Sequence, residues 1–120
     1  MGGGIYIVIA PHQIESFIKG SYGVDNRTMG FGMTFLHEFF HTTVGGEFKD
    51  EVLSTTPVVD IMNNIRQELN HAGYNFGQRM LYRAIPRYGR HYLPFNKEAQ
   101  DAMDNNRLPC DLFGEKFIWF

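Results

Sequence analysis

The segment from Met33 to Gly46 constrains the fold more than any other part of the chain. Its apolar residues recur at the spacing of one helical face, and the double glycine Gly45-Gly46 is a typical helix stop. The residues that share this apolar face are Phe35, Leu36, Phe39, Phe40 and Thr43. We therefore predict an amphipathic helix from Met33 to Val44, which must bury one side against other elements.

The rest of the chain mixes strand and helix signals. A β-branched and aromatic run at residues 5–10 predicts a strand, which we expect to form the edge of a small sheet. Thr56-Pro57 predicts the start of a second helix, with a capping residue followed by proline. The other elements predicted are a short helix at 13–19, loop or edge strand at 20–32, a third helix at 74–85, a fourth helix at 96–104 capped by Asn96, and a strand-like tail at 117–120.

The second helix has its own apolar stripe and an opposite polar side. The stripe comprises Val58, Ile61, Met62, Ile65 and Leu69, and the polar side comprises Asp60, Asn63, Asn64 and Gln67. Together these patterns predict a minimal α+β fold. In it, a small sheet packs on the helix at 33–44, with two or three further helices.

Length and composition limit the kind of protein. At 120 residues the chain is one domain, residues 1–120, and its net charge of −2 argues against a nucleic acid or membrane partner. The lone Cys110 cannot form a cysteine metal cluster, so a metal site must use histidines and carboxylates.

We expect no signal peptide and no membrane span. The start, Met-Gly-Gly-Gly, indicates an expression scar or a cut from a larger chain, and the strand-like run directly after it favours the cut.

The helix at 33–44 carries the pattern His37-Glu38-Phe39-Phe40-His41. Residues four apart lie on one helical face, so both imidazoles can bind one ion, and zinc suits imidazole nitrogen. Glu38 lies about 100 degrees around the helix from His37, which favours a general base beside the metal over a ligand. The alternative is a helix with two partly exposed histidines and a solvated glutamate.

A third protein ligand is needed beside the two histidines. We predict Asp60, because it lies in the first turn of the second helix and is followed by Asn63 and Asn64, which could orient it. Its other interpretation is a carboxylate that stabilises a helix N-terminus. The alternative ligands are Glu51, Glu47, Glu68 and His71.

Three segments resemble a family of zincin metallopeptidases: residues 35–46, 59–69 and 76–82. They resemble the C-terminal effector or toxin zinc peptidase domains of Rhs-like polymorphic toxins, and they are similar to the NleD-type effector proteases. The resemblance covers residues 30–85, and its specific motif is His37-Glu38-Phe39-Phe40-His41. It implies a zinc ion, a protein or peptide substrate, an immunity or inhibitor protein as partner, and export as part of a larger bacterial protein.

In these peptidases, and in the clostridial neurotoxin light chains that they look like, an Arg-x-x-Tyr pair stabilises the transition state. Arg79 and Tyr82 match that spacing. A guanidinium or phenol aimed at the oxyanion of a peptide hydrolysis would lower its barrier. The alternative is a solvated basic face formed by Arg79, Arg83 and Arg87, with Tyr82 in the core. The chain departs from the neurotoxin pattern because it lacks a glutamate ligand at the long spacing.

We therefore expect a zinc metalloendopeptidase. Zinc would activate a water, Glu38 would take its proton, and Arg79 or Tyr82 would hold the oxyanion. Two alternatives belong to other classes of protein. One is a non-catalytic metal-binding interaction domain. The other is a nucleic-acid-directed toxin that uses a tract rich in arginine and tyrosine, namely Arg79, Arg83, Arg87, Arg90, Tyr82, Tyr88 and Tyr92.

Overall fold

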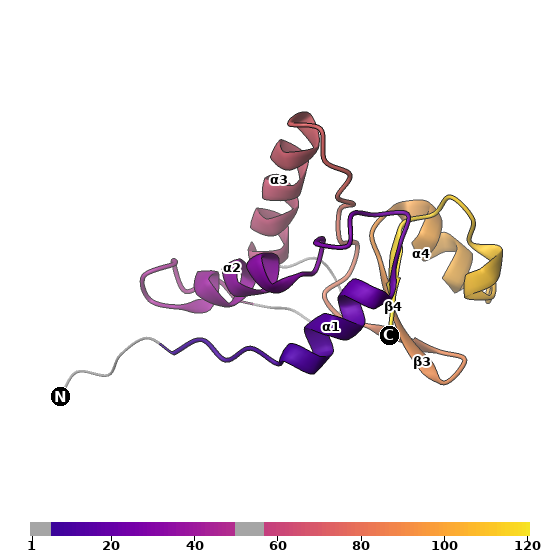
Figure 1. Cartoon of the computed structure of the whole chain (residues 1–120), viewed down its shortest axis with the longest axis horizontal. Helices are drawn as coiled ribbons and strands as arrows, with labels where there is room; N and C mark the ends of the chain where they lie inside the picture. The colour runs from indigo at the N-terminus through magenta and orange to yellow at the C-terminus, as the bar shows by residue number, and fades with distance from the viewer. Residues whose placement is uncertain (1–5, 50–56) are drawn as a thin grey trace.

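The computed structural model describes residues 6–49 and 57–120. Helices and a four-stranded sheet alternate along this part of the chain, which confirms the α+β class (Figure 1). The elements are α1 (Pro11–Lys19), β1 (Ser21–Tyr22), α2 (Phe31–His41), α3 (Pro57–His71), β2 (Ile85–Arg87), β3 (Arg90–Pro94), α4 (Lys97–Asp104), the 3₁₀ helix η1 (Pro109–Asp111) and β4 (Phe117–Trp119).

The sheet is antiparallel throughout and has the strand order β1-β4-β3-β2. Its two central strands pair Leu93 with Ile118 and Tyr92 with Trp119. Because alternate residues of a strand face opposite sides, Leu93 and Ile118 pack with α1, whereas Tyr92 packs with α4. Figure 1 shows these two helices on opposite sides of β4. The sheet thus separates two apolar cores.

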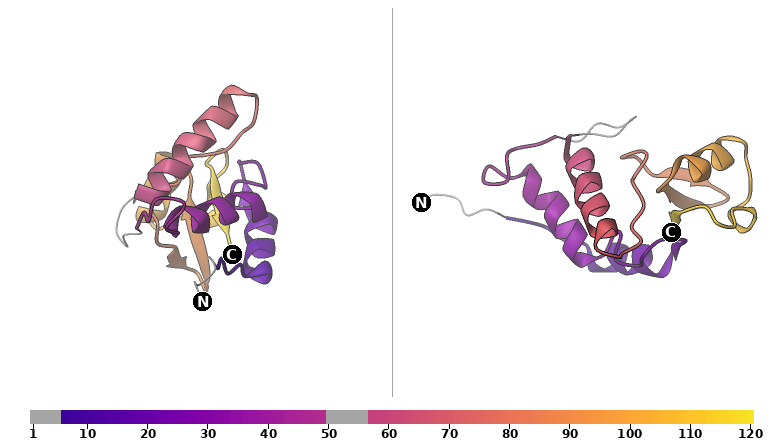
Figure 2. Two further views of the ribbon diagram at one scale, coloured as in Figure 1. Left: turned by 90° about the vertical axis from the view of Figure 1, so that its left-hand side faces the viewer. Right: turned by 90° about the horizontal axis from the view of Figure 1, so that it is seen from above.

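A third core joins α2 to α3. Met33 of α2 is buried with Val58 and Met62 of α3, and Leu36 and Phe40 pack against them. Helix α1 contacts both β4 and α2, so it links this helical pair to the sheet. The two helices lie side by side at some distance from α4 (Figure 2). The helix with the histidines is therefore held chiefly by other helices.

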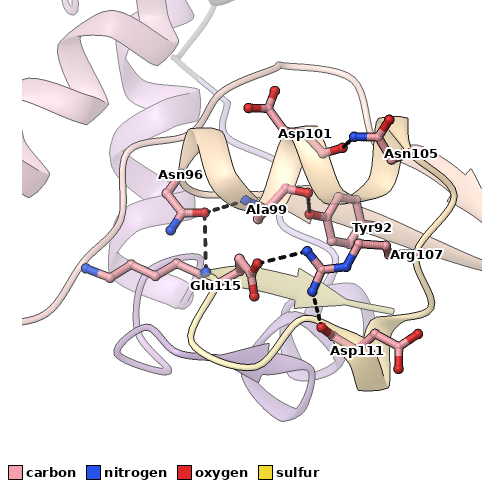
Figure 3. A network of polar contacts seen from close by, with 9 residues as sticks. Tyr92, Asn96, Ala99, Asp101, Asn105, Arg107, Asp111 and Glu115 are labelled. Atoms are coloured by element: carbon pink, nitrogen blue, oxygen red, sulfur yellow. Dashed lines mark hydrogen bonds and ion pairs between the residues drawn. The ribbon is translucent and has the colours of Figure 1, made fainter.

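The opposite end of the molecule, around α4, is closed by polar contacts (Figure 3). The side chain of Asn96 caps α4 by accepting from the backbone N–H of Ala99 at 2.8 Å, as its sequence position predicts. Arg107 forms an ion pair with Glu115 at 3.4 Å and also donates to the carbonyl of Asp111. These contacts tie the chain after α4 to the segment that leads into β4.

The strand predicted at residues 5–10 is wrong for the described residues 6–10. They are extended, but they pair with no described strand, and Tyr6 and Val8 are each 84% exposed. A β-branched run becomes a strand only where a neighbour supplies hydrogen bonds, and here Pro11 begins α1 directly. The edges of the sheet are β1 and β2 instead.

The helix predicted at 74–85 is also wrong, because residues 74–84 are irregular. Two asparagines of α3, seven residues apart, take up their backbone groups. The side chain of Asn70 bonds both the N–H and the carbonyl of Phe76, and that of Asn63 does the same for Arg79. This segment also crosses β3 closely: a Cβ on Gly77 would lie 2.5 Å from the carbonyl oxygen of Phe95. Side-chain bonds thus replace the helical ones.

Other expectations differ less. Helix α2 begins at Phe31 and ends at His41, and Gly45 folds back so that a Cβ there would lie 2.1 Å from the carbonyl oxygen of Phe39. Helix α3 begins at Pro57, as predicted, whereas its expected cap, Thr56, lies outside the described residues. The helix at Lys97–Asp104 and the strand at Phe117–Trp119 are confirmed. The buried stripe of α3 is rotated from the predicted one and comprises Val58, Val59, Met62 and Arg66.

Candidate metal centre and cleft

Helix α2 brings its two histidines together as the spacing predicts. The ring centroids of His37 and His41 are 5.0 Å apart. The ligand atoms of His37, Glu38 and His41 all lie within 4.8 Å of one another, and all three residues are half-buried. Two imidazoles and one carboxylate are a donor set that could hold a metal ion.

The tautomer of His41 follows from its surroundings. Its Nδ1 lies 2.7 Å from the carbonyl oxygen of Phe48. A carbonyl oxygen only accepts, so in this contact Nδ1 carries the hydrogen and donates, and Nε2 keeps the lone pair of the neutral ring. This is the usual outer hydrogen bond of a metal-binding histidine. The geometry of His41 therefore fits a ligand that binds through Nε2.

The third protein ligand is not resolved by this group. Asp60 is exposed in the first turn of α3 and is not among the residues that meet at His37 and His41. Three of the alternatives in the described part of the chain are exposed and outside the group as well: Glu47, Glu68 and His71. Glu51 lies outside the described residues. Asp60 remains a prediction that the present side-chain positions do not favour.

A cleft of about 440 Å³ lies beside His37 and Glu38. Its wall brings together the residues that the sequence singled out for catalysis, namely His37, Glu38, Arg79 and Tyr82. Apolar residues also line the cleft, among them Phe17, Met33 and Leu93 from α1, α2 and β3, respectively. The candidate metal ligands therefore adjoin a cavity large enough for a side chain and its neighbouring backbone.

The irregular segment before β2 carries Arg79 and Tyr82 to α2. The ring of Tyr82 stacks on that of His37, with centroids 6.0 Å apart and an interplanar angle of 16°. Arg79 is 7% exposed, and its guanidinium lies 5.2 Å from the centre of the Tyr82 ring. Its Nε donates to the carbonyl of Leu81 at 3.0 Å, and Nη2 donates to the carbonyl of Tyr82. Arg79 thus shapes the turn that sets Tyr82 beside His37.

Arg66 is a residue of the cleft that the sequence analysis missed. It belongs to α3, is 2% exposed, and donates to the carbonyl of Thr28 at 3.1 Å and to the side chain of Asn63 at 3.0 Å. Burial and the charge of Arg79 lower the pKa of Arg66 to about 9, so it is still cationic at neutral pH. The signal in the sequence was the spacing of Val59, Met62, Asn63, Arg66 and Asn70, which places Arg66 on the inner side of α3.

The arginine and tyrosine tract does not form one exposed surface. Tyr92 is fully buried, and Arg79 lines the cleft, whereas Tyr88 is 50% exposed. The hydroxyl of Tyr88 donates to the carbonyl of Asn106, near α4. Members of the tract thus have different environments, which weakens its interpretation as a single surface for binding nucleic acid.

Comparisons with protein-family models, curated proteins and solved structures gave no significant match to this chain. No helix in the described ranges 6–49 and 57–120 has both the length and the apolar character to cross a bilayer. Interpretation of the site therefore depends on its own residues and their arrangement.

Proposed function

We propose that this chain is a zinc-dependent endopeptidase whose catalytic residues line the cleft beside α2. The observation that carries the proposal is the meeting of His37, Glu38 and His41 beside a cleft that His37 and Glu38 line together with Arg79 and Tyr82. Three of these residues belong to one turn of α2, and the other two come from a distant segment. Convergence of two separate segments on one cavity is typical of an active site.

Zinc held by His37 and His41 would polarise the carbonyl of a bound peptide and lower the pKa of a water molecule. The carboxylate of Glu38 would accept the proton from that water and transfer it to the leaving amine. The Tyr82 hydroxyl would donate to the oxyanion that develops on the carbonyl, since its ring already stacks on His37. Arg79 would hold the turn and add positive charge next to Tyr82.

The decisive experiment separates zinc binding from chemistry at Glu38. The full chain is loaded with zinc, and cleavage of casein is followed by mass spectrometry for the wild type and the Glu38→Gln variant. We expect the variant to keep its zinc and to lose about 100-fold or more in cleavage rate, as is usual for loss of a general base. Glu15→Gln, on an exposed position of α1, is the matched control and should cut like the wild type.

Each result points to one class of protein. Cleavage that survives in Glu38→Gln would contradict the role of Glu38 as base. Stoichiometric zinc without any cleavage of casein or of a broad peptide mixture would favour the non-catalytic metal-binding domain. Loss of zinc from Glu38→Gln would make Glu38 a ligand, in line with its closeness to both histidines.

A further inference from the structure

Arg66 has an unusual environment for a cation. In the described part of the chain its hydrogen-bond acceptors are a carbonyl, an asparagine oxygen and the sulfur of Met29, and none of the ion pairs there includes it. Its Nε is buried and has no hydrogen-bond partner in residues 6–49 and 57–120. A buried charge without an opposite charge is costly, so an arginine retained in this state suggests a role in binding.

The surroundings of Arg66 are positively charged as well. Among the described residues, the charged side chains that line the cleft are Glu38, Arg66, Arg79 and Arg83, in a chain whose net charge is −2. These described side chains carry an excess of positive charge, which would attract a negatively charged group. A further polar atom in the wall, Oγ1 of Thr34, is buried, has no hydrogen-bond partner among the described residues and could donate to such a group.

We propose that the cleft binds a carboxylate of the substrate on Arg66, so that the enzyme selects acidic peptides. This inference rests on the proposed function, because it names the substrate class of the same site. Guanidinium and carboxylate form charge-assisted hydrogen bonds, and Nε of Arg66 is a donor with no acceptor among the described residues. A carboxylate there would also supply the opposite charge that the described residues do not provide.

The shape of the cleft favours glutamate over aspartate. Arg66 lines the cavity and is only 2% exposed, and the apolar residues Phe17, Met33 and Leu93 line the same cavity. A glutamate side chain has a longer aliphatic stem to lie along those walls before its carboxylate meets Arg66. The carboxyl terminus of a peptide has the same chemistry, so both sources of carboxylate must be compared.

The first test measures binding without turnover. The melting temperature of the zinc-loaded chain is recorded with millimolar glutarate, with its neutral diamide and with a short oligothymidylate. Glutarate should raise the melting temperature and the diamide should not, since a ligand stabilises the folded state that binds it. Arg66→Met should abolish the shift, whereas Lys19→Gln, at an exposed cation of α1 that does not line the cleft, should retain it. The Arg66→Met comparison also separates this site from binding to zinc.

The second test measures selectivity in cleavage. Peptides that differ only by glutamate, aspartate or glutamine near the cleaved bond are compared, each with a free or an amidated C-terminus. We expect kcat/KM for the glutamate peptide to exceed that for glutamine by about tenfold or more, and the ratio to fall to about one in Arg66→Met. Arg66→Lys keeps the charge. It should retain a preference for glutamate even if Arg66→Met fails to fold.

The outcomes distinguish this inference from the function on which it rests. Peptide cleavage without a glutamate preference, or no shift with glutarate, overturns the carboxylate site and leaves the peptidase. A glutarate shift that requires Arg66, without cleavage of any peptide, removes the peptidase and leaves the anion site. A preference that follows the free C-terminus supports the site with the terminal carboxylate as its ligand. A shift with oligothymidylate alone overturns the acidic-peptide proposal.

Discussion

Two arginines show how the two ends of the molecule differ. Arg107, near α4, is 44% exposed in its side chain and forms an ion pair with Glu115 (Figure 3). Arg66, on α3, is 2% exposed, and its hydrogen-bond acceptors among the described residues are all neutral. The contact of Arg107 closes a surface turn. The contacts of Arg66 leave a buried positive charge beside a cleft. The contrast indicates that the region around α4 serves the fold and that the region between α1, α2 and α3 serves binding.

The largest expected effect is on zinc affinity at α2. His37→Ala should weaken zinc binding by more than about 100-fold, since even the loss of a ligand's outer hydrogen bond costs about 10- to 100-fold. His12→Ala, at a fully exposed histidine of α1, is the matched control and should bind zinc normally. Competition with a chromogenic chelator measures both. Equal affinity in the two variants would contradict the metal site on α2.

The next largest expected effect is on kcat, and it compares two tyrosines: Tyr82 in the cleft and Tyr88 near α4. Tyr82→Phe removes a hydroxyl from the cleft and should lower kcat about 100-fold, in the range of losing one oxyanion donor. Tyr88→Phe removes a hydroxyl that bonds Asn106 near α4 and should leave kcat unchanged. Steady-state cleavage of one peptide measures both. A normal kcat in Tyr82→Phe would assign the oxyanion to another donor.

Substitutions in the α4 region should lower the stability of the fold and leave zinc affinity unchanged. Leu112 is fully buried in the core with Tyr92 and Met103, so Leu112→Ala should lower the free energy of unfolding by about 2–5 kcal/mol. Phe113→Ala, at a neighbour that is 80% exposed, should cost far less. Chemical denaturation gives both values. If Leu112→Ala also lowered zinc affinity of the folded protein, the two ends would be coupled.

The smallest expected effects are those of substituting Asn63 and Asn70, whose side chains bond the backbone of the segment before β2. Asn63→Ala and Asn70→Ala should each destabilise the fold by about 1–3 kcal/mol, because each leaves backbone groups of that segment without a partner. Only Asn63→Ala should also lower kcat, since Asn63 bonds Arg79 next to Tyr82. Cleavage rates measured well below the melting temperature test this. A similar kcat in both variants would show that the segment acts as one rigid body.

The structural features that could be predicted from the sequence were those determined by residues close together in the chain. The spacing of His37 and His41, the Pro57 start of α3 and the Asn96 cap each depend on a few neighbouring residues, and each is confirmed in the structure. The strand at residues 5–10 and the helix at 74–85 failed because their outcome depended on distant partners. The first lacked a neighbouring strand, and the second was captured by Asn63 and Asn70.

The candidate site likewise contains residues that the sequence predicted and one that it missed. The spacing of Arg79 and Tyr82 indicated a pair, and the structure brings both to the cleft with His37 and Glu38. Arg66 escaped notice because an arginine within a helix usually lies on the solvated side. Asp60 was chosen for its position in the first turn of α3; it is exposed there and outside the group of His37, Glu38 and His41, so its role as a ligand stays a prediction. Which side of a helix is buried is decided by packing, which a single sequence shows only in part.

The most direct test of the account is the position of zinc in crystals of the full chain soaked with zinc. Anomalous diffraction at the zinc edge should give one strong peak about 2.0–2.1 Å from a ring nitrogen of each of His37 and His41, through Nε2 in His41. Tyr82 and the cleft should lie next to it. Absence of a peak between these histidines, or a peak only at His71 or His91, would contradict the metallopeptidase interpretation.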